Sequence, residues 1–239
     1  MEIKSYKKDS FYSYTLGAFP TLELIHNHKE ALLKILIHSS FNNKEVLDEI
    51  KSVSSQCEIQ FNDKLISKLS NKENCYIIGI FKKYEMNLNS NTDHILLAQP
   101  MNMGNFGTII RSALGFNMHD IGLISPCIDI FDPKVLRASM GSFFSVNIKI
   151  FPSFEAYKSQ YPHRIMHSFM LQATKTLQEH TFNKDKYNTL IFGNESKGLD
   201  SSYLDDNSLI IRHEKSIDSL NLPNAISIAL YEFYKQKHL

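Results

Sequence analysis

The sequence is poor in the features that mark secreted, metal-binding and membrane proteins. Its 239 residues hold three cysteines, Cys57, Cys75 and Cys127, which are widely separated and lack the paired spacing of a zinc site. No stretch approaches the ~18 uninterrupted apolar residues that indicate a membrane span, and no apolar segment follows the lysines near the N-terminus. We therefore expect reduced cysteines, no membrane partner and a soluble, cytoplasmic protein.

Charge of one sign is not in excess either. The 26 Lys and Arg side chains nearly balance 25 Asp and Glu, which gives a net charge of +1 with neutral histidines. Composition alone therefore does not indicate a nucleic-acid partner. Any such binding would need a local basic patch, or a surface doubled by dimerisation.

Two pairs of histidines raise the alternative of a metal site. They are His26 with His28, and His163 with His167. Neither pair comes with a cysteine or carboxylate at ligand spacing. We therefore expect no bound metal.

A polar, asparagine-rich break at 86–93 separates two regions of apolar segments. With a 43% hydrophobic share the chain can form two cores, and we expect domains at 1–88 and 89–239. Strand and helix patterns alternate in both, which predicts an α/β fold with a parallel sheet in the second domain. In the first domain we expect strands at 32–38, 58–61 and 75–81 and helices at 44–53 and 63–69; in the second, strands at 95–98, 121–125, 146–151, 165–171, 189–192 and 209–211, with helices between them.

Three clusters rich in Asn, Gly and Ser punctuate the second domain, at 102–111, 193–199 and 219–223. Each follows a predicted strand or opens a predicted helix, so backbone amides and small polar side chains would gather where strands end, the usual ligand crevice of an open α/β sheet. In the first cluster, Asn105 fits the N-cap of a helix and Arg111 lies one to two turns further on. That arrangement is rich in donors and suited to a phosphate or a ribose hydroxyl.

The third cluster opens the last helix of the chain. Ser219 fits its N-cap and Pro223 its first turn, and capping could be the whole role of this cluster. The helix itself has one apolar face, which fits either an interface or the core of a monomer. The face consists of Leu222, Ile226, Ala229, Leu230 and Phe233.

Each cluster alone admits a simpler interpretation. Asn105 could be only a helix cap, and Arg111 only a solvated helix residue. The string 104–107 spells the GXXG loop with which KH domains clamp RNA, but the alternation of strands and helices is longer than a KH module. The two glycines of the second cluster could form only a tight turn. They do not make a Walker A loop, because no lysine and hydroxyl residue follow Gly198.

Taken together and in order, the three clusters resemble the motifs of the SpoU/TrmH family of S-adenosylmethionine-dependent RNA 2′-O-ribose methyltransferases. The segment 132–142 is also similar to one in ribosomal-RNA members. The first domain, with its strand at 32–38, more loosely resembles an L30e-like substrate-binding domain. The matching motifs are Asn105-x-Gly-x-x-x-Arg111, Gly193-Asn-Glu195-x-x-Gly198-Leu199, and Ser219-Leu-Asn221 before an apolar helix.

This resemblance implies a catalytic domain of the SPOUT fold, with a deep trefoil knot at its C-terminal end. It implies S-adenosylmethionine as the methyl donor and RNA as the substrate, most directly 23S ribosomal RNA. Transfer RNA is the alternative within this class, and a non-catalytic RNA-binding protein is the alternative outside it. A homodimer formed through the last helix is also implied. The residues that would bind the donor are Gly193, Asn194, Ile211, Leu220 and Asn221.

The family's catalytic assignments fall on five residues of this chain. The arginine that activates the hydroxyl corresponds to Arg111, acting either as a base or as a clamp on the adjacent phosphate and on developing charge. Asn105 and Glu195 would orient Arg111 and the ribose. Ser219 and Asn221 would hold the nucleotide and keep the first cluster in register.

The chain also departs from the family's pattern near the third motif. Members often have Ile-Pro-Met where this chain has Ile211-Arg212-His213, and Ser-Val where it has Pro223-Asn224. These changes leave the five assigned residues in place. They bear on the backbone of the adenine pocket and on any contact made by Arg212 or His213.

Overall fold

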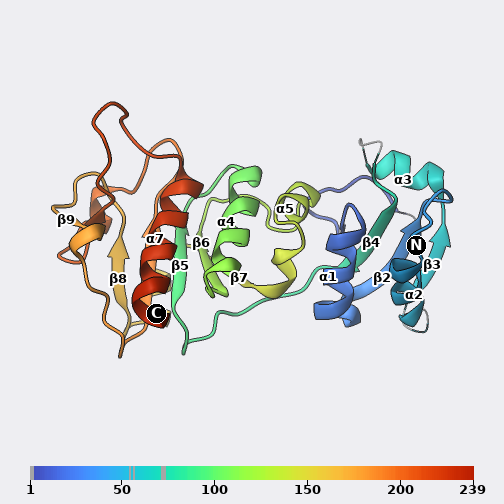
Figure 1. Ribbon diagram of the computed structural model, residues 1–239, viewed down its shortest axis with the longest axis horizontal. Coiled ribbons are helices and arrows are strands. Elements are labelled where there is room, and N and C mark those ends of the chain that lie inside the picture. The colour runs from blue at the N-terminus through green and yellow to red at the C-terminus, as the bar shows by residue number, and fades with distance from the viewer. Residues whose placement is uncertain (1–2, 54, 56, 71–73) are drawn as a thin grey trace. The chain divides into compact units, whose positions relative to one another are not determined.

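The computed structural model describes residues 3–53, 55, 57–70 and 74–239, which form two compact units (Figure 1). The N-terminal unit comprises Met1–Glu85 together with Asp129–Ser145, and the C-terminal unit comprises Met86–Ile128 and Val146–Leu239. The division after Glu85 is close to the predicted boundary at 88. The segment Asp129–Ser145, called here the inserted segment, does not follow the predicted division. The prediction places it in the second domain, whereas in the structure it belongs to the N-terminal unit.

The N-terminal unit is built on a four-stranded sheet in the order β1-β4-β2-β3. Strands β2 and β3 run parallel, whereas β4 is antiparallel to both of its neighbours. The predicted strands and helices of this region are all present. The elements are β1 (Tyr12–Tyr14), α1 (Ala18–His28), η1 (Lys29–Ala31), β2 (Leu32–Ile37), α2 (Lys44–Ser52), β3 (Glu58–Phe61), α3 (Asp63–Leu69) and β4 (Ile77–Lys82).

The inserted segment packs into this unit through its aromatic side chains. It contains α5 (Pro133–Ala138) and η2 (Ser142–Ser145). The ring of Phe131 lies 6.2 Å from that of Phe81, and the ring of Phe144 lies 5.5 Å from it. The Ser13 hydroxyl donates a hydrogen bond to the carbonyl of Phe131 at 2.5 Å. Because these apolar groups are buried here, the segment cannot be assigned from its place in the chain alone.

The C-terminal unit contains a five-stranded parallel sheet in the order β7-β6-β5-β10-β8, as the alternating pattern predicts. The central strands are buried along their whole length, which is typical of a parallel sheet covered on both faces. Strand β10 lies between two earlier strands, β5 and β8. The elements are β5 (His94–Ala98), α4 (Met103–Gly115), β6 (Asp120–Ile124), β7 (Asn147–Phe151), α6 (Phe154–Gln160), β8 (Ile165–Ser168), η3 (Leu177–Glu179), β10 (Asn188–Phe192), η4 (Ser201–Tyr203) and α7 (Leu222–His238).

Two predicted strands of this sheet were partly wrong. The strand expected at 165–171 ends at Ser168, and the next residue, Phe169, forms an isolated bridge with Leu209. The strand expected at 209–211 is β11 (Leu209–Ile210), and it pairs with β9 (Lys175–Thr176) in a separate two-stranded sheet.

The starts of two helices also differ from those predicted. The N-cap of α4 is Asn102, whose side chain accepts a hydrogen bond from the backbone of Asn105 at 2.9 Å, so Asn105 lies inside the first turn. Helix α7 is preceded by Asn221 in the N-cap position, not by Ser219. An N-cap carbonyl accepts from the N–H four residues on, and Pro223 has none to offer Ser219. The N–H of Ala225 bonds instead to the carbonyl of Asn221 at 3.0 Å.

Helices α4 and α7 pack side by side (Figure 1). The predicted apolar face of α7 is buried within its own chain: Ile226, Ala229 and Leu230 are 0% exposed. This face therefore belongs to the core of the unit. The residues of α7 that are exposed and apolar are Ile228 and Tyr231.

Candidate functional site

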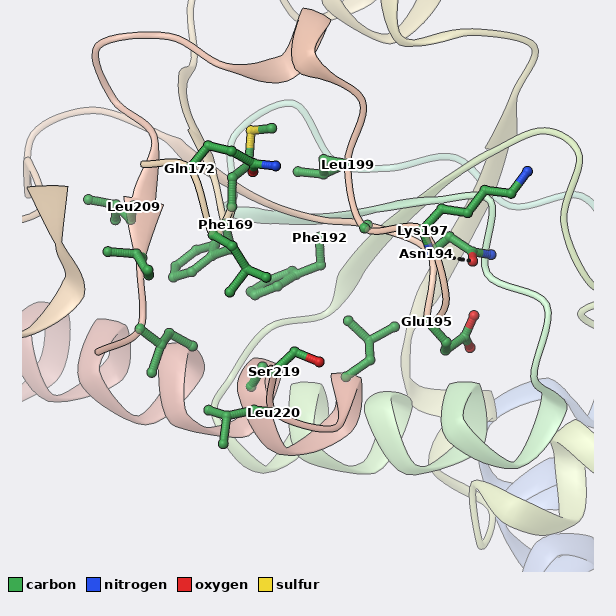
Figure 2. Close-up of a pocket in the computed structure, with 18 of the residues that line it drawn as sticks. Phe169, Gln172, Phe192, Asn194, Glu195, Lys197, Leu199, Leu209, Ser219 and Leu220 are labelled. Atoms are coloured by element: carbon green, nitrogen blue, oxygen red, sulfur yellow. Dashed lines mark hydrogen bonds between the residues drawn. The ribbon is translucent and has the colours of Figure 1, made fainter. Parts of the chain in front are cut away.

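A cavity of about 250 Å³ lies where the second and third clusters meet (Figure 2). Its walls come from the chain that follows β8, the chain that follows β10, strand β11 and the loop that precedes α7. The carboxyl ends of parallel strands meet at one edge of a sheet, so these segments converge although they are far apart in sequence. The lining segments are 169–172, 192–199, 209–211 with His213, and 219–220 with Leu222 and Ala225.

The cavity has an aromatic wall that the sequence analysis did not identify. The rings of Phe169 and Phe192 are stacked, with centroids 4.5 Å apart and planes at 11° (Figure 2). Phe169 follows β8 and Phe192 ends β10, at the same edge of the sheet. An aromatic residue at the end of each strand was the sequence signal that could have indicated this wall. Leu209, Ile211 and Leu220 add apolar surface beside them. The wall is therefore suited to a flat, partly apolar group.

The second cluster forms a tight loop for which both glycines are required. The backbones of Asn194 and Gly198 exchange two hydrogen bonds, at 3.1 and 2.9 Å. Gly198 has a φ of +69°, which favours glycine. A Cβ on Gly193 would lie 2.1 Å from the backbone carbon of Gly198, closer than atoms can approach. The glycines thus make the turn, and the turn brings Asn194 and Glu195 to the cavity.

Glu195 and Asn194 join the second cluster to the first. The Glu195 carboxylate accepts hydrogen bonds from the backbone N–H groups of Met101, at 3.4 Å, and Asn102, at 3.3 Å. The side-chain amide of Asn194 donates to the carbonyl of Gln99 at 2.7 Å. These contacts hold the loop after β10 against the start of α4. Glu195 therefore contacts the backbone at the start of the first cluster, and no bond to Arg111 or Asn105 is present among the described residues.

The first and third clusters are joined through their helices. The hydroxyls of Ser112 in α4 and Ser227 in α7 are hydrogen-bonded at 2.9 Å. Arg111, the neighbour of Ser112, is exposed and makes no hydrogen bond or ion pair with any residue that the structure describes. Its guanidinium is thus available to a ligand.

The predicted site residues divide into two groups. Asn105, Arg111 and Asn221 do not line the cavity, although α4 and the start of α7 place them in the same unit. Their catalytic and binding roles remain predictions. The predicted residues that do line it are Gly193, Asn194, Glu195, Ile211, Ser219 and Leu220.

The two departures from the family pattern take different positions. His213 lines the cavity, and its Nδ1 donates a hydrogen bond to the carbonyl of Ile211 at 2.8 Å. Arg212 is exposed and lies outside the cavity.

The histidine pairs do not meet at one site. His26 pairs with Glu49, and the ring of His28 stacks on Tyr84 at 4.4 Å. His167 is buried and bonded to Asn188 at 3.0 Å, and burial lowers its pKa. Within the described residues, the structure contains no group of three or more His, Cys, Asp or Glu placed to hold a metal, and no helix that is long and apolar enough to cross a membrane.

Comparisons with known proteins agree with the motifs. A tRNA/rRNA methyltransferase of Synechocystis, itself uncharacterized, is 32% identical over 149 residues, which cover 60% of this chain and 53% of that one. The 23S rRNA (uridine(2479)-2′-O)-methyltransferase of Streptomyces viridochromogenes is 31% identical over 151 residues, covering 60% of this chain and 52% of that one. This chain therefore matches only about half the length of these curated relatives.

The fold itself also has a solved counterpart. The SpoU methyltransferase AviRb from Streptomyces viridochromogenes, in complex with AdoMet, superposes with a TM-score of 0.80 over 95% of this chain and 91% of that one, at 21% identity. The family model of the SpoU rRNA methylases matches residues 93–231, which contain all three clusters and the whole cavity. The chain belongs to the SpoU rRNA methylase family.

Proposed function

We propose that this protein transfers a methyl group from S-adenosylmethionine to a ribose 2′-hydroxyl of RNA. The observation that carries the proposal is the junction made by Glu195, which holds the cavity loop against the helix that bears Arg111. Through this junction the donor cavity and the unpartnered guanidinium of Arg111 belong to the same unit. The 2′-O-methyltransferase of Streptomyces viridochromogenes supports the reaction type.

The cavity suits S-adenosylmethionine by its chemistry. The stacked rings of Phe169 and Phe192, with Leu220, offer apolar surface for a nucleobase, and the backbone around Gly193 offers polar edges. Asn194 and Ser219 add polar side chains. The AdoMet-bound structure of AviRb, which shares the fold, supports this assignment. When bound, the donor supplies an electrophilic methyl on a sulfonium.

The acceptor hydroxyl is a poor acid, so the protein has to position it and stabilise the charge that develops on oxygen. Arg111 is exposed, and a guanidinium is almost never deprotonated in proteins. We therefore assign it the role of a clamp on the ribose oxygen and the neighbouring phosphate rather than that of a base. Asn105 lies between one and two turns before it on α4 and would orient the same ribose.

The proposed substrate is 23S ribosomal RNA, with transfer RNA as the second candidate. The name of the Synechocystis relative covers both classes, whereas the Streptomyces relative is named for 23S rRNA. We further propose that the N-terminal unit is an L30e-like domain that selects the RNA and that the protein acts in the cytoplasm. Its exposed lysines, among them Lys7, Lys8 and Lys82, and its separate core support the role in RNA selection.

A trefoil knot and a homodimer complete the proposal. The placement of β10 between the earlier strands β5 and β8 supports a chain that re-enters its own fold. The dimer would use the exposed side of α7, where Ile228 is 42% and Tyr231 54% exposed, because the other face is buried.

Two measurements test the proposed function. Isothermal titration should show binding of S-adenosylmethionine to the folded protein. Incubation with labelled donor should methylate an in vitro transcript of 23S ribosomal RNA more than bulk transfer RNA, and mapping should place the label on ribose. A folded protein that binds no donor would refute the enzyme and favour a non-catalytic RNA-binding protein.

A further inference from the structure

A second cavity, of about 440 Å³, adjoins the donor cavity. The two share Leu171, Ile210 and His213 as lining residues. The rest of its wall comes from strand β9 and from the loop between β11 and α7. Its volume lies within the range of about 300–1,000 Å³ that is usual for ligand sites.

Arg212, at the edge of this cavity, has a fixed backbone and an unpartnered side chain. The carboxamide of Gln178 accepts from the Arg212 N–H at 3.3 Å and donates to the Arg212 carbonyl at 3.0 Å. The exposed guanidinium bonds to none of the residues that the structure describes. A free guanidinium on a fixed backbone beside a cavity can donate two hydrogen bonds to a phosphodiester.

The other walls offer the complementary parts of a nucleotide site. Apolar surface comes from Leu171, Ile210 and Ile217, and Thr174 adds a hydroxyl. The lining contains as many cationic as carboxylate side chains, so the cavity does not favour a ligand that is only an anion, such as free phosphate. The carboxylates can accept hydrogen bonds from base amino groups or ribose hydroxyls, while the cations bind phosphate. The charged residues are Arg212, Lys215, Glu214 and Asp218.

We infer that the second cavity holds a nucleotide of the RNA that flanks the methylated one. The inference rests on the proposed function, which requires a ribose oxygen to approach the donor cavity. RNA that brings a ribose to the donor cavity has to pass close to the second cavity, because the two cavities share part of their lining. His213 stands in the shared wall, with its Nδ1 bonded to Ile211 and its Nε2 left for a ligand.

Three variants test the inference. Arg212→Ala should raise the KM for a 23S ribosomal RNA transcript ~10-fold or more, and lower the slope of log affinity against log salt by about 1, since one phosphate contact is lost. Ile217→Trp fills the cavity without changing charge and should raise the same KM. Both should leave the Kd for S-adenosylmethionine and the kcat within about twofold, because neither residue lines the donor cavity. Lys186→Ala is the matched control, an exposed cation just before β10 at the opposite edge of the sheet.

Two results would overturn the inference. One is an unchanged KM for RNA in both Arg212→Ala and Ile217→Trp. The other is weaker donor binding at an unchanged KM for RNA, since the cavity would then be an extension of the donor site. If the unaltered protein methylates no RNA, the proposed function fails, and RNA affinities of the same variants still decide whether the cavity binds RNA.

Discussion

Arg111 is the residue on which the proposed chemistry depends most. Because it is exposed and without a partner among the described residues, Arg111→Ala should leave the fold and the donor affinity nearly unchanged. Methyl transfer should fall ~100-fold or more, the scale of a lost transition-state contact. Single-turnover methylation measures the rate, and isothermal titration measures donor affinity.

The variant Arg111→Lys separates two forms of the clamp. Lysine keeps the charge but not the planar fork. Substantial rescue would indicate a simple electrostatic role, and no rescue would indicate bidentate positioning. Turnover of Arg111→Ala at the unaltered rate would show that Arg111 is only a solvated helix residue.

Gly193 gives a second prediction at this scale. A Cβ there would lie 2.1 Å from the Gly198 backbone, so Gly193→Ala must distort the loop that lines the donor cavity. We expect at least ~10-fold weaker donor binding, which corresponds to about 1.4 kcal/mol. Gly115→Ala is the control, because a Cβ at Gly115 meets nothing within 4 Å. Equal donor affinities in the two variants would contradict the account of the loop.

Among the helices and strands, short elements with one clear cap were predictable from sequence. Helix α3 begins after Asn62, whose side chain accepts from the N–H of Leu65 at 3.0 Å, and its predicted range is the observed one. Helix α4 was harder because Asn102 and Asn105 are both suitable caps. The local sequence pattern does not show which of the two is the N-cap. The hydrogen bond from the Asn102 backbone to Glu195, which comes from a distant segment, favours Asn102.

The cavity wall depended on pairing between distant segments. Phe169 and Phe192 stack only because β8 and β10 are neighbours in the sheet. Chain order gives no sign of that pairing, since β9 and η3 lie between them. The sequence predicted the glycine loop and the third cluster, which line one part of the cavity. It did not predict the aromatic wall of the same cavity.

Helix α7 carries the test of the homodimer. Ile228→Glu should keep the fold and weaken association, because Ile228 is 42% exposed. Ile226→Glu is the contrasting variant, and it should lower the free energy of unfolding by ~3 kcal/mol or more, since Ile226 is 0% exposed and a charge would be buried there. Light scattering reports the mass and circular dichroism the fold. A monomeric unaltered protein at micromolar concentration would rule out the dimer.

At the scale of the whole molecule, stability should fall in acid. Burial, and then the nearby Arg164, lower the pKa of His94 to about 4. In the neutral ring, Nε2 donates a hydrogen bond to the carbonyl of Asn89 and Nδ1 accepts one from the Tyr157 hydroxyl, both at 2.8 Å. The unfolded chain takes up this proton near pH 6.5, so the stabilisation is complete above that pH and is lost as pH falls towards 4. The loss from His94 should be about 2–3 kcal/mol, because each pH unit in this window is worth ~1.4 kcal/mol.

Urea unfolding at pH 7.5 and pH 4.5 measures this effect. His94→Gln should show a smaller difference between the two pH values than the unaltered protein. His163→Gln is the control, since His163 is exposed. An unchanged difference in His94→Gln would mean that other groups, such as carboxylates, account for the acid sensitivity.

Removal of the N-terminal unit tests its role in RNA selection, and the inserted segment decides how it must be done. Deleting residues 1–85 alone would expose Phe131, Leu136 and Phe143, which are now buried, and should cause aggregation. Deletion combined with replacement of 129–145 by a short Gly/Ser linker should preserve donor binding and abolish selective methylation. Unchanged selectivity for ribosomal RNA in that variant would refute the proposed role.

The inserted segment also sets an order of events during synthesis. The N-terminal unit needs Asp129–Ser145 to cover its aromatic core, and these residues are made after strands β5 and β6 of the other unit. At ~5–20 residues per second, a ribosome takes several seconds to travel from the end of β4 to Ser145. Throughout that interval, Phe81 lacks the rings of Phe131 and Phe144. The N-terminal unit can therefore finish folding only after part of the C-terminal unit has already been made.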